Sequence, residues 1–589
     1  MAWHRADPPR RQPQSEVLVR TVSGGAPSQP VTDKRLLGEL LVERQHLTAD
    51  QLTEALFQQR ASGKRLGALL VELGVVDERV LADALAEHFH LTVVDLRKQT
   101  PEPAALARLT ESQARSMSAL PVLLLEGQLQ VAVADPSEQL AKDLTKAADM
   151  PVLMVVASAS DIARAIDRNY RALADVSRHV SAFCAVDDRR RFERRPAVSL
   201  AAEAPVVHVV NLVVTQALRD RASDVHIESG DTHVRVRFRI DGVLHEVLTL
   251  PVGMGPAVAS RIKVLAGMNI VERRRPQDGQ LTMDVDGRSI DIRVATSGTV
   301  TGEKVVMRLL DKSKPLFKAH DLGMPDDTNK TYTELVQSPF GMVICAGPTG
   351  CGKTTSLYAT LSELDSAERN IMTIEDPVEY RFPTINQIQI NEQAGVSFAA
   401  GLKAILRQDP DIVLVGEVRD QETARIAVQS ALTGHFVLSS LHATDAASAL
   451  HRFLDMQIEP FLIASAVSGV LSQRLVRRIC DQCRRPYSPT PDELSFFRDS
   501  GGTTPSRGFF VGEGCTFCAD TGYSDRIGVY ELIVMSGELR QLVVERASHQ
   551  QIRELAIAQG TRTLRMEAAS LVEAGTTTIA ETVRSIYTL

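Results

Sequence analysis

Residues 347–354 read Gly-Pro-Thr-Gly-Cys-Gly-Lys-Thr, which is the pattern of a phosphate-binding P-loop. The apolar run Met342–Ala346 before the motif is typical of a buried parallel strand, and Thr355–Leu361 after it is typical of the beginning of a helix. Strand, loop and helix therefore follow one another in the order that phosphate binding requires. The alternative, a glycine-rich turn without function, leaves this context unexplained, so we expect the chain to bind a nucleoside triphosphate.

The residue types in the motif fit this chemistry. Its glycines let backbone N–H groups turn inward around an anion, and the helix N-terminus adds partial positive charge. Lys353 is expected to reach the β- and γ-phosphates, and Thr354 to offer its hydroxyl to Mg²⁺. The predicted nucleotide-binding residues are Gly347, Pro348, Thr349, Gly350, Cys351, Gly352, Lys353, Thr354 and Thr355.

The composition indicates several folded domains and disfavours nucleic acid as a partner. A chain of 589 residues implies about three to five domains. Its contents of 44% hydrophobic and 24% charged residues are those of globular proteins. The net charge is −7, and one Trp with eight Tyr offers few side chains for stacking on bases. We therefore expect no nucleic-acid partner.

The sequence also indicates where the protein is found. No window contains about twenty consecutive apolar residues, and Met1–Gln14 is charged and proline-rich without an apolar segment. We expect a soluble protein of the cytoplasm. In such a reducing compartment, disulfide bonds among the seven cysteines are disfavoured.

The pattern of residues changes several times along the chain. Helical sequence begins near Lys34, and the segment Leu37–Val42 is echoed by Leu66–Val71, which predicts two copies of one helix pair. The strand-like segment Val234–Ile240 alternates arginine with apolar residues. The charged stretch Asp187–Pro196 favours a solvated tether over a nucleic-acid-binding patch.

These changes predict a multidomain α/β protein. The expected divisions are a disordered arm at 1–33, an N-terminal docking or regulatory region with two helical repeats at 34–172, a linker at 173–203, an α+β domain at 204–311, a short linker at 312–323, a nucleotide domain with a parallel sheet at 324–474, a tetracysteine subdomain at 475–535, and a helical C-terminal region at 536–589.

Acidic residues follow two further apolar strands of the nucleotide domain. Glu417 comes after Ile412–Val415, where a P-loop protein presents the carboxylate that helps to hold Mg²⁺. Glu375 and Glu379 follow Ile371–Ile374 and should reach the same sheet edge. We expect Glu375 to orient and deprotonate the attacking water. The alternative for Glu375 and Glu379 is that they are helix caps or solvated acids, since strand-end carboxylates also serve as caps.

Two histidines flank the strand-like segment Phe436–Leu441. Either His435 or His442 could sense the γ-phosphate from a strand end. Each could equally be a structural hydrogen-bond donor, because most lone histidines are. The residue chemistry alone leaves both alternatives open.

With these motifs the chain resembles the GspE/PilB family, the assembly ATPases of type II secretion systems and type IV pili. The resemblance covers roughly residues 205–589. The motifs that carry it are Gly347–Thr354, Thr373–Glu379, Leu406–Asp411, Gly416–Asp420, Thr433–His442, Ser223–Glu228, Glu272–Gly279 and Gly302–Arg308.

The resemblance implies a fold, an assembly and residue roles. It implies a RecA-like ATPase domain preceded by a PAS-like α+β domain, arranged as a hexameric ring. By the family's pattern, Glu375 lies in an acidic box, Glu417 in the Walker B element, and His435 and His442 in a histidine box. Arginines of the preceding domain should neutralise phosphate charge. We favour Arg293 and Arg308 over Arg235, Arg237 and Arg239, whose shared strand face could simply be solvated.

Four cysteines form two Cys-x-x-Cys pairs. These pairs are Cys480 with Cys483 and Cys515 with Cys518, and four thiolates satisfy tetrahedral Zn²⁺. The interval between the pairs is long for a compact zinc ribbon, but the family has a similar tetracysteine insert. Disulfides are disfavoured by the compartment, and a redox pair is disfavoured by its duplication. We therefore predict a structural zinc site.

The N-terminal repeat resembles the cyclic di-GMP-binding repeat of some of these ATPases. The second copy keeps Arg65 and Gly74 but has His88 where the motif ends in Gln. The first copy has Leu36 in place of the arginine that would contact guanine or phosphate, and Gln45 in place of glycine. Cyclic di-GMP is thus one candidate ligand, and a docking role towards a membrane platform is the alternative.

These observations favour a motor that hydrolyses ATP with Mg²⁺ at the inner face of the cytoplasmic membrane. Its partners would be further copies of itself and the inner-membrane platform and docking proteins of a secretion or pilus machine. The alternative is a nucleotide-gated scaffold or cyclic di-GMP receptor with little turnover. Intact Lys353, Thr354, Glu375 and Glu417 argue against that alternative. A retraction motor is disfavoured because such relatives generally lack the tetracysteine insert and the long N-terminal region.

Overall fold

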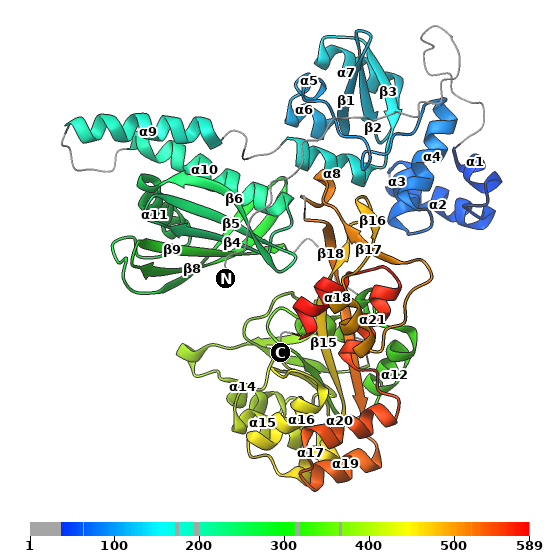
Figure 1. Ribbon diagram of the computed structural model, residues 1–589, viewed down its shortest axis with the longest axis vertical. Helices are drawn as coiled ribbons and strands as arrows, with labels where there is room; N and C mark the ends of the chain where they lie inside the picture. The colour runs from blue at the N-terminus through cyan, green and yellow to red at the C-terminus, as the bar shows by residue number, and fades with distance from the viewer. Residues whose placement is uncertain are drawn as a thin grey trace. The chain divides into compact units, whose positions relative to one another are not determined.

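The structure of the protein is a computed structural model, and it forms two compact units. The units are Met1–Ile166 and Asp167–Leu589, and we describe each by itself (Figure 1). The structure describes residues 37–62, 64–170, 173, 176–193, 200–311, 318–364, 368–519 and 521–587. The arm expected at 1–33 lies outside these residues.

The first unit begins with the two repeated helix pairs that the sequence predicts. Their helices are α1 (Leu37–Glu43), α2 (Ala49–Ser62), α3 (Leu66–Glu72) and α4 (Glu78–Phe89). A Cβ atom on Gly38 would lie 2.6 Å from Leu52 of the following helix, and one on Gly67 would lie 3.0 Å from Leu81. The repeated glycine therefore allows each pair of helices to approach closely, in the same way in both copies.

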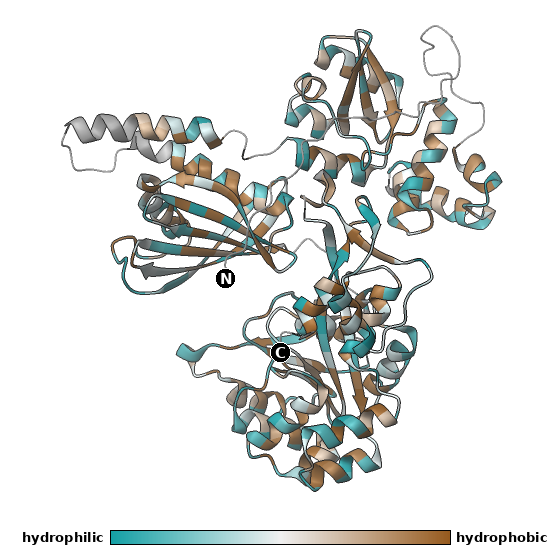
Figure 2. Cartoon of the chain, in the orientation of Figure 1, coloured by the Kyte–Doolittle hydropathy of each residue, from teal (hydrophilic) through white to brown (hydrophobic). Residues whose placement is uncertain are grey.

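A small sheet completes the first unit. Its strands pair in the order β1-β2-β3, with β1 and β2 antiparallel and β2 and β3 parallel. The strands are mostly hydrophobic in Figure 2, and they bury Leu129, Val131 and Val133 against Leu144 of a covering helix. The elements are α5 (Pro103–Leu106), α6 (Glu111–Ser116), β1 (Ala119–Leu125), β2 (Gln128–Val133), α7 (Glu138–Ala148), β3 (Val152–Val156) and α8 (Ala159–Asn169).

The second unit begins with two helices, α9 (Val176–Glu193) and α10 (Leu200–Arg219). They occupy much of the segment 173–203, for which we expected a linker. Val176 and Phe183 are buried in the core that α9 shares with α10, and Val180 packs against that core. This spacing of four and three residues makes one apolar helix face, which the charged stretch after it obscured in the sequence.

The α+β domain is an antiparallel sheet covered on one face by helices. The strand order is β6-β5-β4-β9-β8-β7. Phe238 and Met307 face the helices and are buried with Val214 and Ile262, whereas the alternate residues form a polar face that carries the arginines. The elements are β4 (Asp224–Ser229), β5 (His233–Ile240), β6 (Val243–Pro251), η2 (Val252–Met254), α11 (Gly255–Leu265), β7 (Gln277–Val285), β8 (Arg288–Thr299) and β9 (Gly302–Asp311).

The nucleotide domain contains a seven-stranded sheet in the order β12-β11-β13-β14-β10-β15-β18. All neighbouring pairs are parallel except β15 with β18, which is antiparallel. The strands are β10 (Gly341–Ala346), β11 (Ile371–Glu375), β12 (Asn386–Gln389), β13 (Ile412–Val415), β14 (Phe436–Leu441), β15 (Val467–Ile479) and β18 (Tyr523–Val534).

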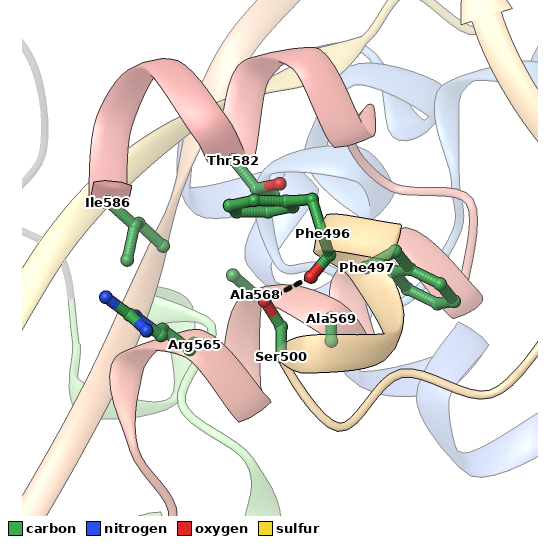
Figure 3. Close-up of a pocket in the computed structure, with 8 residues that line it drawn as sticks. All are labelled: Phe496, Phe497, Ser500, Arg565, Ala568, Ala569, Thr582 and Ile586. Carbon is green, nitrogen blue, oxygen red and sulfur yellow. Dashed lines mark hydrogen bonds between the residues drawn. The ribbon is translucent and has the colours of Figure 1, made fainter. Parts of the chain in front are cut away.

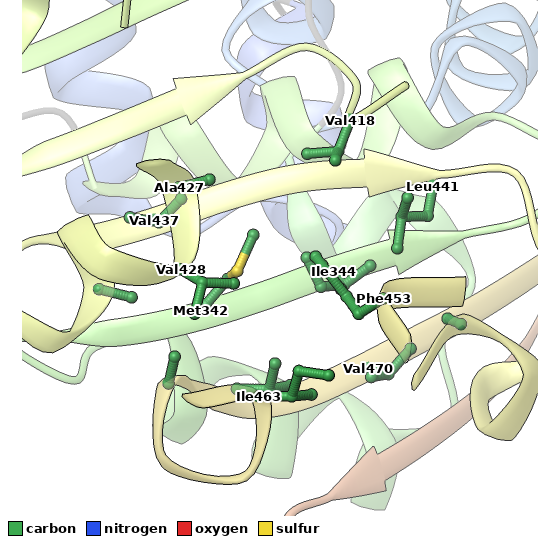
Figure 4. Close-up of a cluster of buried hydrophobic side chains, with 14 of the residues drawn as sticks. Met342, Ile344, Val418, Ala427, Val428, Val437, Leu441, Phe453, Ile463 and Val470 are labelled. Carbon is green, nitrogen blue, oxygen red and sulfur yellow. The ribbon is translucent and has the colours of Figure 1, made fainter. Parts of the chain in front are cut away.

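Helices cover both faces of this sheet. Figure 4 shows one buried cluster, in which Met342 and Ile344 of β10 meet Val428, Phe453 and Ile463 of three different helices. The helices are η3 (Ala319–Leu322), α12 (Asp326–Val336), α13 (Lys353–Leu364), η4 (Glu392–Ala394), α14 (Phe398–Ile405), α15 (Gln421–Leu432), α16 (Ala446–Asp455), α17 (Pro460–Ala466), α19 (Gly537–Val544) and α20 (His549–Ala558).

The nucleotide domain extends beyond the boundary expected at 474. Strand β15 runs on to Ile479, and β18 joins the same sheet after the cysteine pairs. Val543 of α19 and Ile552 of α20 belong to the main core of the domain. The expected C-terminal region therefore supplies part of the ATPase core, because its helices cover apolar residues that the parallel strands expose.

The residues between β15 and β18 form an insert that packs against the C-terminal helices. The elements are β16 (Arg484–Tyr487), α18 (Pro491–Asp499), β17 (Phe509–Gly512), η5 (Thr516–Cys518), α21 (Leu564–Glu573), α22 (Ile579–Thr582) and the π-helix η6 (Val583–Tyr587). A cavity of about 10 Å³ lies between α18, α21, α22 and η6. At its wall, Ser500 Oγ donates to the Phe496 carbonyl at 2.9 Å (Figure 3). A cavity of this size holds at most one water molecule, so it is a packing gap and not a nucleotide site.

Candidate nucleotide site and tetracysteine cluster

The P-loop connects β10 to α13, as the sequence predicts. Gly350 and Gly352 have φ angles of +79° and +93°, which favour glycine. At Gly347, where φ is +153°, a Cβ atom would lie 2.5 Å from Cys351 Sγ. The loop therefore requires these glycines in order to curl back onto the N-terminus of α13.

The side chains of the loop are placed for phosphate and metal contacts. Lys353 Nζ donates to the carbonyls of Gly347 and Pro348, at 2.8 and 3.0 Å, so its ammonium lies along the loop. Thr354 and Thr355 are exposed in the first turn of α13. Backbone N–H groups lack helical partners in that turn, which makes it suitable for an anion.

Glu417 and His442 lie together at the edge of the sheet where the P-loop begins. They follow β13 and β14, which run parallel to β10, so the three strands end at one edge. His442 Nε2 is 3.5 Å from the Glu417 carboxylate, which also pairs with Arg419. His442 is half exposed, with 51% of its side chain accessible, and can therefore meet a ligand.

His435 lies at the other end of β14. Its Nδ1 is 3.1 Å from the Ser430 carbonyl and 3.3 Å from Thr433 Oγ1. A strand of this length separates it from the P-loop edge by about 20 Å. Of the two histidines that the sequence leaves open, the structure brings only His442 to the site, and His435 holds the turn before β14.

Glu375 is buried and surrounded by hydrogen-bond donors. Its carboxylate accepts from Thr373 Oγ1 at 2.5 Å, from Gln387 Nε2 at 3.2 Å and from the Tyr358 hydroxyl. Burial, together with the Glu375 charge, raises the pKa of Tyr358 well above its usual value, so that hydroxyl stays a donor. These contacts suit a residue that anchors its neighbours better than one that meets a water molecule.

Glu379 is the more accessible acid of the same segment. Its side chain is 28% exposed, and its backbone N–H donates to the Tyr358 hydroxyl at 3.2 Å. Tyr358 thus binds Glu375 on one side and positions Glu379 on the other. Tyr358 and Gln387 were not among the residues expected from the sequence, because neither belongs to a motif.

The structure separates the two arginines favoured from the sequence. Arg293 pairs with Glu379 through both guanidinium nitrogens, at 3.2 and 2.9 Å. Arg308 is its direct cross-strand neighbour and binds Asp224 at 3.0 Å, within the α+β domain. Arg293 therefore lies at the acidic segment, while Arg308 remains 59% exposed on the polar sheet face.

The other three arginines share that face with acidic residues. Arg235 and Arg237 pair with Glu228 at 3.4 and 2.7 Å, and Arg239 pairs with Asp224 at 3.5 Å. Burial alone would raise the pKa of Glu228, but hydrogen bonds from Arg237 and a lysine lower it to about 2. These arginines are therefore paired within their own domain.

The four cysteines of the insert converge. The Sγ–Sγ distances are 3.9 Å for Cys480–Cys515, 3.8 Å for Cys483–Cys518 and 3.7 Å for Cys515–Cys518. Sulfurs about 2.3 Å from a tetrahedral zinc ion are about 3.8 Å apart, so the cluster has the dimensions of a zinc site. Backbone N–H groups of Cys515 and Gly522 also donate to Cys518 Sγ, both at 3.2 Å. Such bonds stabilise a thiolate.

Comparison with known proteins identifies the family. The sequence model of the family described as "Type II/IV secretion system protein" matches residues 199–584. The chain belongs to this family. A second model, the MshEN domain, matches residues 89–175. The type II/IV secretion assignment agrees with the RecA-like α/β domain and the motifs at its P-loop edge.

Two relatives in the secretion family are similar over almost the whole chain, and a solved structure is similar over part of it. The "Type IV pilus assembly ATPase PilB" of Myxococcus xanthus is 39% identical over 556 residues, covering 93% of this chain and 98% of the relative. The "Type II secretion system protein E" of Xanthomonas campestris pv. campestris is 41% identical over 553 residues, covering 93% and 97%. The X-ray structure of the Legionella pneumophila ATPase DotB is 21% identical, covers 63% of this chain and 94% of its own, and has a TM-score of 0.48.

A helix needs about twenty predominantly apolar residues to span a membrane. Among the residues that the structure describes, no helix combines the length and apolar content needed to cross a membrane.

Proposed function

We propose that this chain is a motor that hydrolyses ATP and thereby powers the assembly of a type IV pilus or a type II secretion pseudopilus. The observation that supports this most directly is the shared sheet edge, where Lys353 and Thr354 follow β10 while Glu417 follows β13 and His442 follows β14 of the same sheet. Family membership supports the same activity.

The residues at this sheet edge would have different roles in ATP hydrolysis. Lys353 would neutralise the β- and γ-phosphates, and Thr354 with Glu417 would hold Mg²⁺, which supplies further positive charge to the phosphates. Glu379 would orient the attacking water, and Glu375 would fix the acidic segment through Tyr358. Our sequence-based assignment of the water to Glu375 remains the alternative.

Arginines of the α+β domain would stabilise the charge that develops on the phosphates. Arg293 is near the acidic segment, and Arg308 is exposed enough to reach a nucleotide of another copy in a hexameric ring. Replacing Arg308 by Ala should lower the rate of ATP hydrolysis by at least about tenfold, because such arginines contribute several powers of ten in other P-loop enzymes. An Arg308→Ala protein with the parent rate would contradict this role.

The tetracysteine cluster would hold one structural Zn²⁺ through Cys480, Cys483, Cys515 and Cys518. The bound ion would fix the insert, which has little core of its own. Elemental analysis of the purified chain should give about one zinc per chain, and a Cys483→Ser variant should retain much less. A value far below one in the parent chain would exclude the site.

The motor would act at the inner face of the cytoplasmic membrane, through a platform protein and docking proteins of the machine. The first unit would make the docking contact. The alternative is that its repeats bind cyclic di-GMP through Arg65, whose side chain is 70% exposed at the start of α3. Titration calorimetry of the chain with cyclic di-GMP tests this ligand. An Arg65→Ala variant is the matched control.

A steady-state ATPase assay on chain sized by light scattering tests the central proposal. We expect Mg²⁺-dependent hydrolysis by the parent chain and loss of nucleotide binding in Lys353→Ala. Retention of ATP without turnover would favour a nucleotide-gated scaffold. A chain that neither binds nor hydrolyses ATP would refute the motor.

A further inference from the structure

Gln473 lies on β15, directly behind the P-loop. Strand β15 pairs with β10, and the Gln473 residue is only 1% exposed. Its Oε1 accepts from Ser356 Oγ at 2.9 Å and from Cys345 Sγ at 3.2 Å, while its Nε2 donates to the Cys351 carbonyl at 2.7 Å. One buried side chain thus joins the strand before the P-loop, the loop itself and the helix after it.

The hydrogen bond from Gln473 to the Cys351 carbonyl fixes the direction of the next N–H group in the loop. In a trans peptide unit the C=O and the following N–H point in opposite directions. Because the Cys351 carbonyl points at Gln473, the N–H of Gly352 points away from β15 and towards the concave side of the loop. Inward-pointing N–H groups of this kind are what bind phosphate in a P-loop.

The surrounding groups leave Gln473 little freedom. A Cβ atom on Gly352 would lie 3.1 Å from Gln473 Nε2, so glutamine and loop are in contact. Arg474 Nη1 donates to the Gln473 carbonyl at 2.9 Å and fixes the backbone at this point. Burial raises the pKa of Cys345 well above its usual value, which keeps its thiol a donor to Gln473.

The loop has a physical need for such a support. Gly350 and Gly352 adopt positive φ angles, and glycine has more conformational freedom to lose than any other residue. If the loop were free to change shape, each binding event would have to order it, and affinity would fall accordingly. A hydrogen bond from a rigid strand removes much of that freedom before the nucleotide arrives.

We propose that Gln473 is a positioning residue that holds the P-loop in its phosphate-binding shape by fixing the peptide between Cys351 and Gly352. This inference rests on the proposed function, in which the loop binds Mg-ATP. Gln473 itself touches no reacting atom. It acts through the orientation of the Gly352 N–H.

The first test compares ATP affinities of full-length variants with Mg²⁺ present. Gln473→Leu has a similar size but makes none of the three hydrogen bonds, and we expect roughly tenfold weaker ATP binding. Ser472→Ala changes the preceding residue of β15, whose hydroxyl has no hydrogen-bond partner, and should bind like the parent. Gln216→Leu removes another fully buried glutamine, in the α+β domain, and should lower thermal stability without changing ATP affinity.

The second test uses pH to restore the lost donor. In Gln473→Glu a carboxylate oxygen would face the Cys351 carbonyl, and binding should weaken at pH 8. Burial raises the pKa of such a carboxyl, so protonation at about pH 6 would provide an O–H that can donate to Cys351. We expect the ATP affinity of this variant, divided by that of the parent at the same pH, to rise as pH falls.

The outcomes distinguish the positioning role of Gln473 from the proposed ATPase function. Parent-like affinity in Gln473→Leu, or an equal loss in Gln216→Leu, would overturn the positioning role while leaving the ATPase intact. A pH-independent affinity ratio for Gln473→Glu would overturn it as well. If the parent chain bound no ATP, the proposed function and this inference would both fail.

Discussion

At the scale of single residues, the site differs most from expectation in its acids. The sequence places Glu375 and Glu379 in one motif and cannot rank them, since both follow the same strand. The structure distinguishes them by environment: Glu375 is 4% exposed with its oxygens occupied by donors, whereas Glu379 reaches solvent. The hydrogen-bond donors around Glu375 include Tyr358 and Gln387, which come from other elements of the domain. The sequence around Glu375 therefore does not reveal them.

This difference in environment predicts that two matched substitutions affect different properties of the protein. Glu379→Gln should lower kcat by at least about a hundredfold with little change in thermal stability, because a general base contributes that much to proton transfer. Glu375→Gln should instead lower the unfolding temperature, since its new amide NH₂ would face hydroxyl donors. Kinetics and thermal unfolding of both variants check this. A larger loss of kcat in Glu375→Gln than in Glu379→Gln, at unchanged stability, would show that Glu375 is the residue that orients the attacking water.

At the scale of elements, the C-terminal helix α22 is joined to β15 by a buried carboxylate. Glu581 accepts from the Arg477 side chain at 2.7 and 3.0 Å and from the Arg584 side chain at 2.5 and 2.8 Å. Burial alone would raise the pKa of Glu581, but the hydrogen bonds from both arginines outweigh it and lower this pKa. The carboxylate is therefore favoured in the folded protein.

The lowered pKa predicts a pH-dependent stability difference. The pKa of a glutamate in an unfolded chain is about 4.3. Because the pKa of Glu581 is lower in the folded protein, its carboxylate stabilises the fold when the pH is above about 4.3. This stabilisation is lost as the pH falls through the folded pKa. Glu581→Gln should lower the free energy of unfolding by about 3 kcal/mol at pH 7, because the largely buried guanidinium of Arg477 loses its charged partner. The difference from the parent should shrink below about pH 4.

Urea denaturation at several pH values measures this difference. Glu554→Gln, at an exposed position of α20, is the control and should change stability by no more than about 0.5 kcal/mol. A difference between Glu581→Gln and the parent that did not shrink between about pH 4 and pH 2 would contradict the interpretation.

The elements also show what sequence can and cannot predict here. The strand, loop and helix around Lys353 are contiguous, so local patterns suffice to predict them. Gln473 lies more than a hundred residues away and meets the P-loop only because β15 pairs with β10. The available signal was a polar pair, Gln473-Arg474, inside an apolar strand. Strand β18 was missed as part of the sheet for the same reason, since its pairing with β15 crosses the whole insert.

At the scale of the whole molecule, the proposed ring predicts that subunits depend on one another. Lys353→Ala subunits should be unable to bind phosphate but should still assemble with parent subunits. Mixing equal amounts should then lower activity below half of that expected for the parent alone, because each ring would contain inactive members. Light scattering should give the mass of six chains. Activity in strict proportion to parent content, or a monomer at all concentrations, would contradict the ring.

The separation of β15 from β18 by residues 480–522 constrains the order in which a ribosome can deliver a working domain. The strand beside the P-loop is translated before its antiparallel neighbour β18 and before α19 and α20, which cover part of the core. A nascent chain released before β18 would expose one edge of β15 and the apolar residues that α19 and α20 cover. Premature termination between the end of β15 and the end of α20 should therefore yield an aggregating polypeptide, and not a shortened enzyme.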